Sequence, residues 1–213
     1  MRKHILVWTI LSVMVLSGCS IGDTVEKRLS DTLTEIHTAE QDYRDVQSDL
    51  YKIEQKEQEQ FESIMKLTQK QKDELESGVA ELKKLQDERS SLIEDEVASM
   101  KKAKDLAESF DVDIKKADEE TINAIQTLKT ATIERYDLHS VLISEYKKLQ
   151  DHQNNLYDLL VNEETELPEL KDEVDKVNIQ NEKVKSAINA FNESTKEVNT
   201  LKEELFSSFE DEK

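Results

Sequence analysis

The sequence predicts an all-α protein, an elongated up-and-down bundle of four helices. Between residue 23 and the C-terminus the chain has one glycine, Gly78, and one proline, Pro168, and it lacks the alternating β-branched runs of strands. Its apolar residues recur instead at spacings of three and four, which places them on one face of a helix. A rod of three longer helices is the alternative.

The first predicted helix covers residues 25–67. Its apolar residues follow a heptad seam with a polar gap at Glu57 and Gln60, which Phe61 covers in part. The seam consists of Val25, Leu29, Ile36, Ala39, Tyr43, Val46, Leu50, Ile53, Ile64 and Leu67.

A second apolar series runs from Leu75 to Phe110 and is four residues out of phase with the first. Such a shift indicates either a stutter in one continuous helix or a turn. Residues 68–74 contain no helix breaker that would decide between them. We expect a turn, because one helix over residues 24–110 would have no partner of matching length.

The third predicted helix begins at Ile114, behind Asp111 and Asp113 as candidate N-caps, and extends to Leu160. Its apolar stripe is broad, as is typical of a bundle helix.

An acidic connection over residues 162–168 follows, and Pro168 fits the first turn of the fourth helix. The fourth apolar series continues to Leu205, and residues 207–213 are expected to fray. Residues 23–206 are therefore predicted to form a single elongated domain.

The first 18 residues have the layout of a cleaved lipoprotein signal peptide. A basic head precedes an uncharged run over residues 5–16, which is too short to span a bilayer because a spanning helix needs about 20 apolar residues. The following LSGC stretch resembles the bacterial lipobox. That resemblance implies cleavage between Gly18 and Cys19 and a diacylglyceryl group on the Cys19 thiol, with residues 19–22 as the lipidated N-terminus and a short linker.

The charge of the chain restricts its partners. The sequence has 29 basic and 48 acidic residues, a net charge of −19. Residues 1–18 carry two basic residues and no acid, so 27 basic and 48 acidic residues remain after them, a net charge of −21. Such an excess argues against nucleic acid as a partner and against the bundle lying flat on anionic lipid. Acyl chains on Cys19 would then provide the membrane contact.

The sequence offers little catalytic or ligand-binding chemistry. After the signal peptide its histidines are His37, His139 and His152, and none lies in a Glu-x-x-His or His-Glu-x-x-His motif. His139 and His152 are expected on or beside the seam of the third helix. We therefore predict no catalytic residue, no metal site and no cofactor.

Two surface features are considered as binding sites. The carboxylates around the third connection could hold Ca²⁺, although they match no EF-hand loop and a solvated acidic turn is the preferred interpretation. They are Glu163, Glu164, Glu166, Glu169, Asp172 and Glu173. Tyr51 and Tyr157 lie off the strict seam and could flank it or offer an aromatic surface to a glycan.

Four stretches of the chain carry a family resemblance. They are KIEQKEQEQFESIMKL (52–67), LQDERSSLIEDEVASMKKA (85–103), ERYDLHSVLISEYKKLQDHQNNLYDLL (134–160) and KVNIQNEKVKSAINAFNESTKEVNTLKEELF (176–206). With the lipobox and the order of segments, the chain resembles the cell-wall-binding lipoprotein family of Gram-positive bacteria over nearly all of its length after the signal peptide. The resemblance implies a long four-helix bundle on the outer face of the cell membrane and brings no catalytic residues.

These observations favour a non-enzymatic, lipid-anchored extracytoplasmic protein that contacts the cell wall or another envelope protein. Its expected partners are membrane lipid through acylated Cys19 and either peptidoglycan or an envelope protein. The first alternative is an adaptor that binds a membrane enzyme or transporter through an exposed apolar strip. A ligand- or metal-binding bundle is the second.

Overall fold

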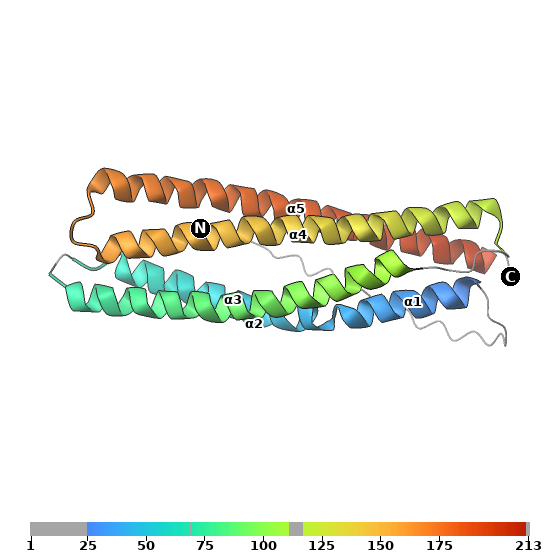
Figure 1. The fold of residues 1–213 in the computed structure, drawn as a ribbon, viewed down its shortest axis with the longest axis horizontal. Coiled ribbons are helices and arrows are strands. Elements are labelled where there is room, and N and C mark those ends of the chain that lie inside the picture. The colour runs from blue at the N-terminus through green and yellow to red at the C-terminus, as the bar shows by residue number, and fades with distance from the viewer. Residues whose placement is uncertain (1–24, 69, 111–116, 212–213) are drawn as a thin grey trace.

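The computed structural model describes residues 25–68, 70–110 and 117–211, and in these residues every regular element is a helix. The helices form a long rod (Figure 1). In chain order they are α1 (Val25–Ala39), α2 (Gln41–Ile64), α3 (Lys72–Ser109), α4 (Glu119–Val161) and α5 (Leu167–Asp211). α1 and α2 follow one another along the rod and together form one arm of the bundle. The five helices of the described residues therefore make four arms, and the predicted all-α up-and-down bundle is confirmed.

The first two arms are joined by a turn, as expected. α2 ends at Ile64 and α3 begins at Lys72, so the turn starts slightly before residues 68–74, and α2 packs on α3. The three-helix rod is therefore not the fold. Gly78 permits the close approach of these helices, because a Cβ atom there would lie 2.3 Å from Cγ2 of Ile64.

The third helix starts later than predicted. α4 begins at Glu119, and its N-cap is Asp118, whose carboxylate accepts hydrogen bonds from the Thr121 N–H and hydroxyl, each at 2.9 Å. This side chain satisfies a free N–H group of the first turn, which fixes the start of the helix. The candidate caps Asp111 and Asp113 lie outside the described residues.

The end of α5 also differs from the expectation. Fraying was predicted from residue 207, but α5 is helical through Asp211, and Phe209 is only 8% exposed. Phe209 follows Leu205 by four residues, and both pack against Leu29 and Ile125. Apolar packing at this end therefore extends the helix. Pro168 lies in the first turn of α5, as predicted.

Three apolar clusters follow one another along the rod. At one end, where α1 and α4 begin and α5 finishes, Leu29, Leu128 and Leu205 are packed together; we call this the α1 end. A middle cluster includes Ile36, Met100 and Phe191 of α1, α3 and α5.

At the opposite end the chain passes from α2 to α3 and from α4 to α5; we call this the far end. The buried residues of its cluster are Ile64, Val79, Leu82 and Tyr157, from α2, α3 and α4. α5 contributes none of them, so it leaves the shared core toward the far end. None of the helices described here is both long and apolar enough to cross a membrane.

Candidate functional site

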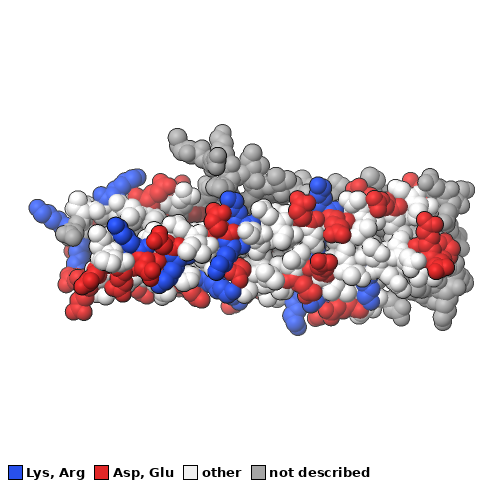
Figure 2. Space-filling view, turned by 90° about the horizontal axis from the view of Figure 1, so that it is seen from above, with Lys and Arg blue, Asp and Glu red and all other residues white. Residues whose placement is uncertain are grey.

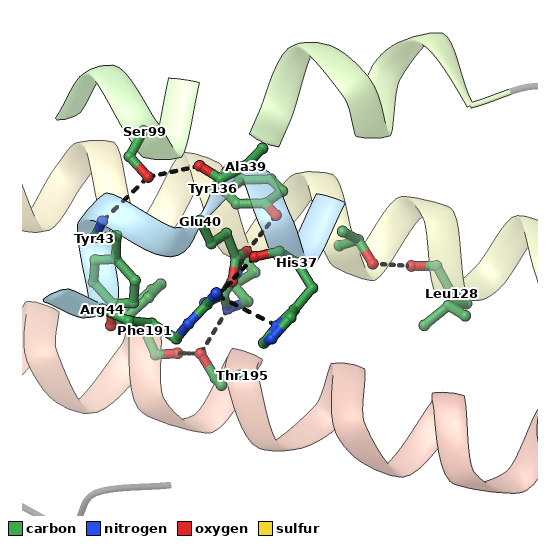
Figure 3. Close-up of polar contacts among 12 residues, drawn as sticks. His37, Ala39, Glu40, Tyr43, Arg44, Ser99, Leu128, Tyr136, Phe191 and Thr195 are labelled. Atoms are coloured by element: carbon green, nitrogen blue, oxygen red, sulfur yellow. Dashed lines mark hydrogen bonds and ion pairs between the residues drawn. The ribbon is translucent and has the colours of Figure 1, made fainter. Parts of the chain in front are cut away.

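The break between α1 and α2 is produced by a side chain of α3. The Ser99 hydroxyl donates a hydrogen bond to the Ala39 carbonyl oxygen at 2.7 Å and accepts one from the Tyr43 N–H at 3.2 Å (Figure 3). In an uninterrupted helix the Tyr43 N–H would bond to the Ala39 carbonyl directly. Insertion of a side chain into this ladder breaks a helix. Ser99 is 4% exposed, so the break is part of the core.

A buried ion pair lies at this break. Glu40, 6% exposed, is the residue between α1 and α2, and its Oε1 accepts hydrogen bonds from Arg135 Nη1 at 2.6 Å and from the Tyr136 hydroxyl at 2.5 Å. Arg44 Nη1 lies 3.8 Å from Oε2 (Figure 3). Burial, followed by the nearby Glu40 carboxylate, raises the pKa of Tyr136, so its hydroxyl stays protonated and donates to Glu40.

Arg135 extends this contact to α5. Its Nε donates to the Thr195 hydroxyl at 2.9 Å, and its guanidinium carbon lies 5.0 Å from the centre of the Phe191 ring. One arginine on α4 thus joins the α1–α2 break to α5. Removal of either charge would leave the other buried without its main counter-ion.

A second buried pair lies beside the first. Glu96 Oε1 is 2.6 Å from His139 Nε2, and its Oε2 accepts from the Gln47 side chain at 3.0 Å. The His139 ring meets Phe191 edge-on at 5.4 Å and Tyr43 at 5.9 Å. Burial raises the pKa of Tyr43 to about 12.

A third buried pair lies toward the far end. Arg89 Nη1 donates to Glu57 Oε2 at 2.5 Å, and Nη2 donates to the Gln153 side chain at 2.8 Å. Burial raises the pKa of Glu57 to about 7, against the attraction of Arg89. In the described part of the chain, Glu57 Oε1, Arg89 Nε and Gln86 Oε1 are buried without a hydrogen-bond partner.

These pairs are suited to fix the register of the helices. Charged groups inside a bundle can pair in one alignment of the helices and are left unpaired in others, which is their best-attested role. Two grooves in the described surface, about 410 Å³ between α2 and α3 and about 570 Å³ between α4 and α5, are not lined by Glu40, Glu96 or His139. The buried pairs therefore lie apart from these two grooves.

The residues predicted from the sequence are dispersed along the rod. Gly18 and Cys19 lie outside the described residues. His139 is buried on the seam, His152 Nδ1 lies 2.8 Å from Glu173 Oε1, and burial and Arg44 lower the pKa of His37. The three histidines do not form one site.

The acidic connection is partly neutralised by lysines. Glu163 pairs with Lys72, and Lys176 Nζ lies 2.7 Å from Asp172 and 3.2 Å from Glu173. Over residues 25–68, 70–110 and 117–211, no three His, Cys, Asp or Glu side chains converge as a metal site would require.

The two tyrosines considered for a glycan surface lie apart. Tyr157 is 3% exposed and packs against Ile64 and Val79, whereas Tyr51 is 49% exposed. They do not form one platform.

The polar gap at Glu57 is visible in the sequence, but most of the buried polar residues were not predicted from it. Arg89 lies four residues after Leu85 and four before Ile93, at a seam position, and is 3% exposed. A charged residue at an apolar position of a helical repeat is the signal that could have found it. Glu40 follows the seam residue Ala39 and only flanks the seam, so it gives a weaker signal.

The comparisons agree with this fold. The model of the YkyA family, described as "Putative cell-wall binding lipoprotein", matches residues 24–208 and confirms the resemblance predicted from the sequence. A 1.6 Å crystal structure of a conserved protein of unknown function from Staphylococcus aureus is similar, with a TM-score of 0.76 and 17% sequence identity over 85% of this chain and 91% of that chain. At this identity the likeness concerns the fold alone. No curated protein matches the sequence.

Proposed function

The chain belongs to the YkyA family of cell-wall binding lipoproteins, and from this premise we propose that it is a non-enzymatic envelope protein, anchored through acylated Cys19 to the outer face of the cell membrane, whose far end meets the cell wall. The family description and the lipobox support the anchor. Cleavage between Gly18 and Cys19 is part of the proposal.

The observation that carries the proposal is that the chain enters the rod at one end and leaves the other end free for contact. Val25 begins α1 at one end, beside the buried Leu29 and Phe209, and the α2–α3 and α4–α5 connections lie at the other (Figure 1). Val25 is six positions after Cys19, and this stretch of chain spans at most about 20 Å. With 45 residues in α5, the far end lies about 65 Å along the rod.

The charge of the protein constrains how it meets the wall. A net charge of −21 after residue 18 repels anionic wall polymers, so contact requires amine-bearing peptidoglycan or bridging divalent cations. It also holds the rod away from anionic lipid, which fits an upright orientation.

Two measurements test the proposal. The acyl-free protein should be retained by purified sacculi at physiological salt, with or without Ca²⁺; absence of retention in both conditions contradicts wall binding. The Cys19→Ser variant should be lost from the membrane fraction or stay unprocessed, and normal processing and membrane retention contradict the anchor.

A further inference from the structure

The first half of α5 carries an apolar stripe that the other helices cover only in part. Leu167, Leu170, Val174 and Val177 recur at spacings of three and four and therefore lie on one face. Leu167 is 65% exposed and Val174 39%, whereas Leu170 and Val177 are half-buried. We call these four residues the α5 stripe.

The break at Glu40 explains why the stripe is uncovered. Before the break, α1 shares a core with the second half of α5, where Ile36 and Phe191 belong to one cluster. After it, α2 packs on α3, and the core at the far end is built without α5. In Figure 1, α5 lies across α4 from α3 at this end.

Polar contacts connect the first half of α5 to α4. Gln180 donates to the backbone oxygen of Glu145 at 2.9 Å and to its carboxylate at 2.7 Å, and His152 contacts Glu173. Although burial opposes the shift, hydrogen bonds from His152 and Lys176 keep the pKa of Glu173 below its usual range. The interface with α4 leaves Leu167 and Val174 of the stripe exposed.

The charge around the stripe selects the partner. Residues 163–175 contain seven acidic residues and one lysine. Among the described residues, the exposed Glu164, Glu166, Glu169 and Asp175 have no ion-pair partner. Figure 2, which views the rod from above Figure 1, shows acidic and basic side chains interspersed with uncharged surface. A second copy of this acidic chain or an anionic membrane would be repelled here.

We propose that the α5 stripe is the docking surface for a basic amphipathic helix of a partner protein. The apolar face of that helix would pack on Leu167, Leu170, Val174 and Val177, and its lysines or arginines would pair with the unpartnered carboxylates of residues 163–175. This is the kind of contact that an adaptor requires, and it does not depend on anchoring at Cys19 or on wall binding.

Binding of a designed helix tests this inference. The full chain is held in phosphatidylcholine nanodiscs, with empty nanodiscs as the blank. The probe is an 18-residue fluorescent peptide with leucine at heptad positions a and d and lysine on its flanks. Fluorescence anisotropy should show binding that weakens with salt, whereas an analogue with glutamate in place of lysine should bind at least tenfold more weakly.

Matched variants separate docking from simple charge attraction. Leu167→Ser/Val174→Ser should weaken binding at least tenfold at unchanged charge. Val141→Ser, which changes an exposed valine of α4 outside the stripe, should leave binding unchanged. The proposal is overturned if the stripe variant binds the lysine peptide as tightly as the wild type does. It is also overturned if the wild type binds the glutamate peptide as tightly as the lysine peptide. If sedimentation shows that the protein forms a dimer and that the dimer does not bind the peptide, the stripe is the contact surface for a second copy. That result also overturns the proposal.

Discussion

Replacing Arg135 by methionine should destabilise the protein strongly, because Glu40 would keep its buried charge and lose its main counter-ion. Breaking a buried ion pair from one side costs about 3–5 kcal/mol. Arg44, 3.8 Å from Glu40, offsets part of this loss, so we expect about 3 kcal/mol. Glu40→Met leaves Arg135 with Thr195 as its remaining hydrogen-bond acceptor and should cost a similar amount.

The double variant Glu40→Met/Arg135→Met removes both charges and should cost much less than the sum of the two. It leaves the Tyr136 hydroxyl without its acceptor, for about 1–3 kcal/mol. Adding Tyr136→Phe removes that group and should bring stability close to the wild type.

Urea unfolding followed by circular dichroism measures these differences. With a slope of about 2 kcal/mol per molar urea, each single variant should lower the midpoint by more than about 1 M. Lys52→Met, in an exposed pair with Asp49, is the control and should change the midpoint little. Single variants that each lose less than about 1 kcal/mol, or a double variant that loses their full sum, would refute the reasoning.

Three further substitutions test other parts of the core. Ser99→Ala leaves the Tyr43 N–H without its partner, so the free energy of unfolding should fall by about 1–3 kcal/mol. The Tyr43 amide should also lose protection from hydrogen exchange. Unchanged protection would contradict a bridging role of the Ser99 hydroxyl. The pKa of Glu57 is about 7 in the folded protein against an ordinary 4.5. Between these two pH values Glu57 therefore binds a proton in the folded state and releases it on unfolding. Wild-type stability should therefore fall as the pH rises from about 4.5 through 7, by at most about 1.4 kcal/mol per unit, and Glu57→Gln should remove this component in urea titrations at several pH values; an unchanged slope would count against it. Gly78→Ala should lower the melting temperature despite the better helix propensity of alanine, because its Cβ would overlap Ile64, and a stabilised variant would show that the contact relaxes freely.

The fold class followed from the sequence because it depends on local information. Spacings of three and four, one glycine and one proline after residue 23, and the phase shift before Leu75 are sufficient for helices and a turn. The start of α4 was misplaced because several acidic residues could cap it, and only Asp118 is seen to do so. The end of α5 was misplaced because Phe209 is buried by residues distant in sequence.

The sequence by itself determined the helical repeat, the acidic charge and the lipobox, which are properties of neighbouring residues. Only the tertiary structure decided where the first arm breaks, because Ser99 lies 60 residues from the Ala39 carbonyl that it contacts. It also decided which charges are buried, since Glu40 is buried against Arg135, 95 residues away in the sequence. The uncovered α5 stripe lies beyond this break, where α2 packs on α3 and the core is built without α5. Apolar spacing predicts that a helix face needs a partner, but the path of another helix decides whether it has one.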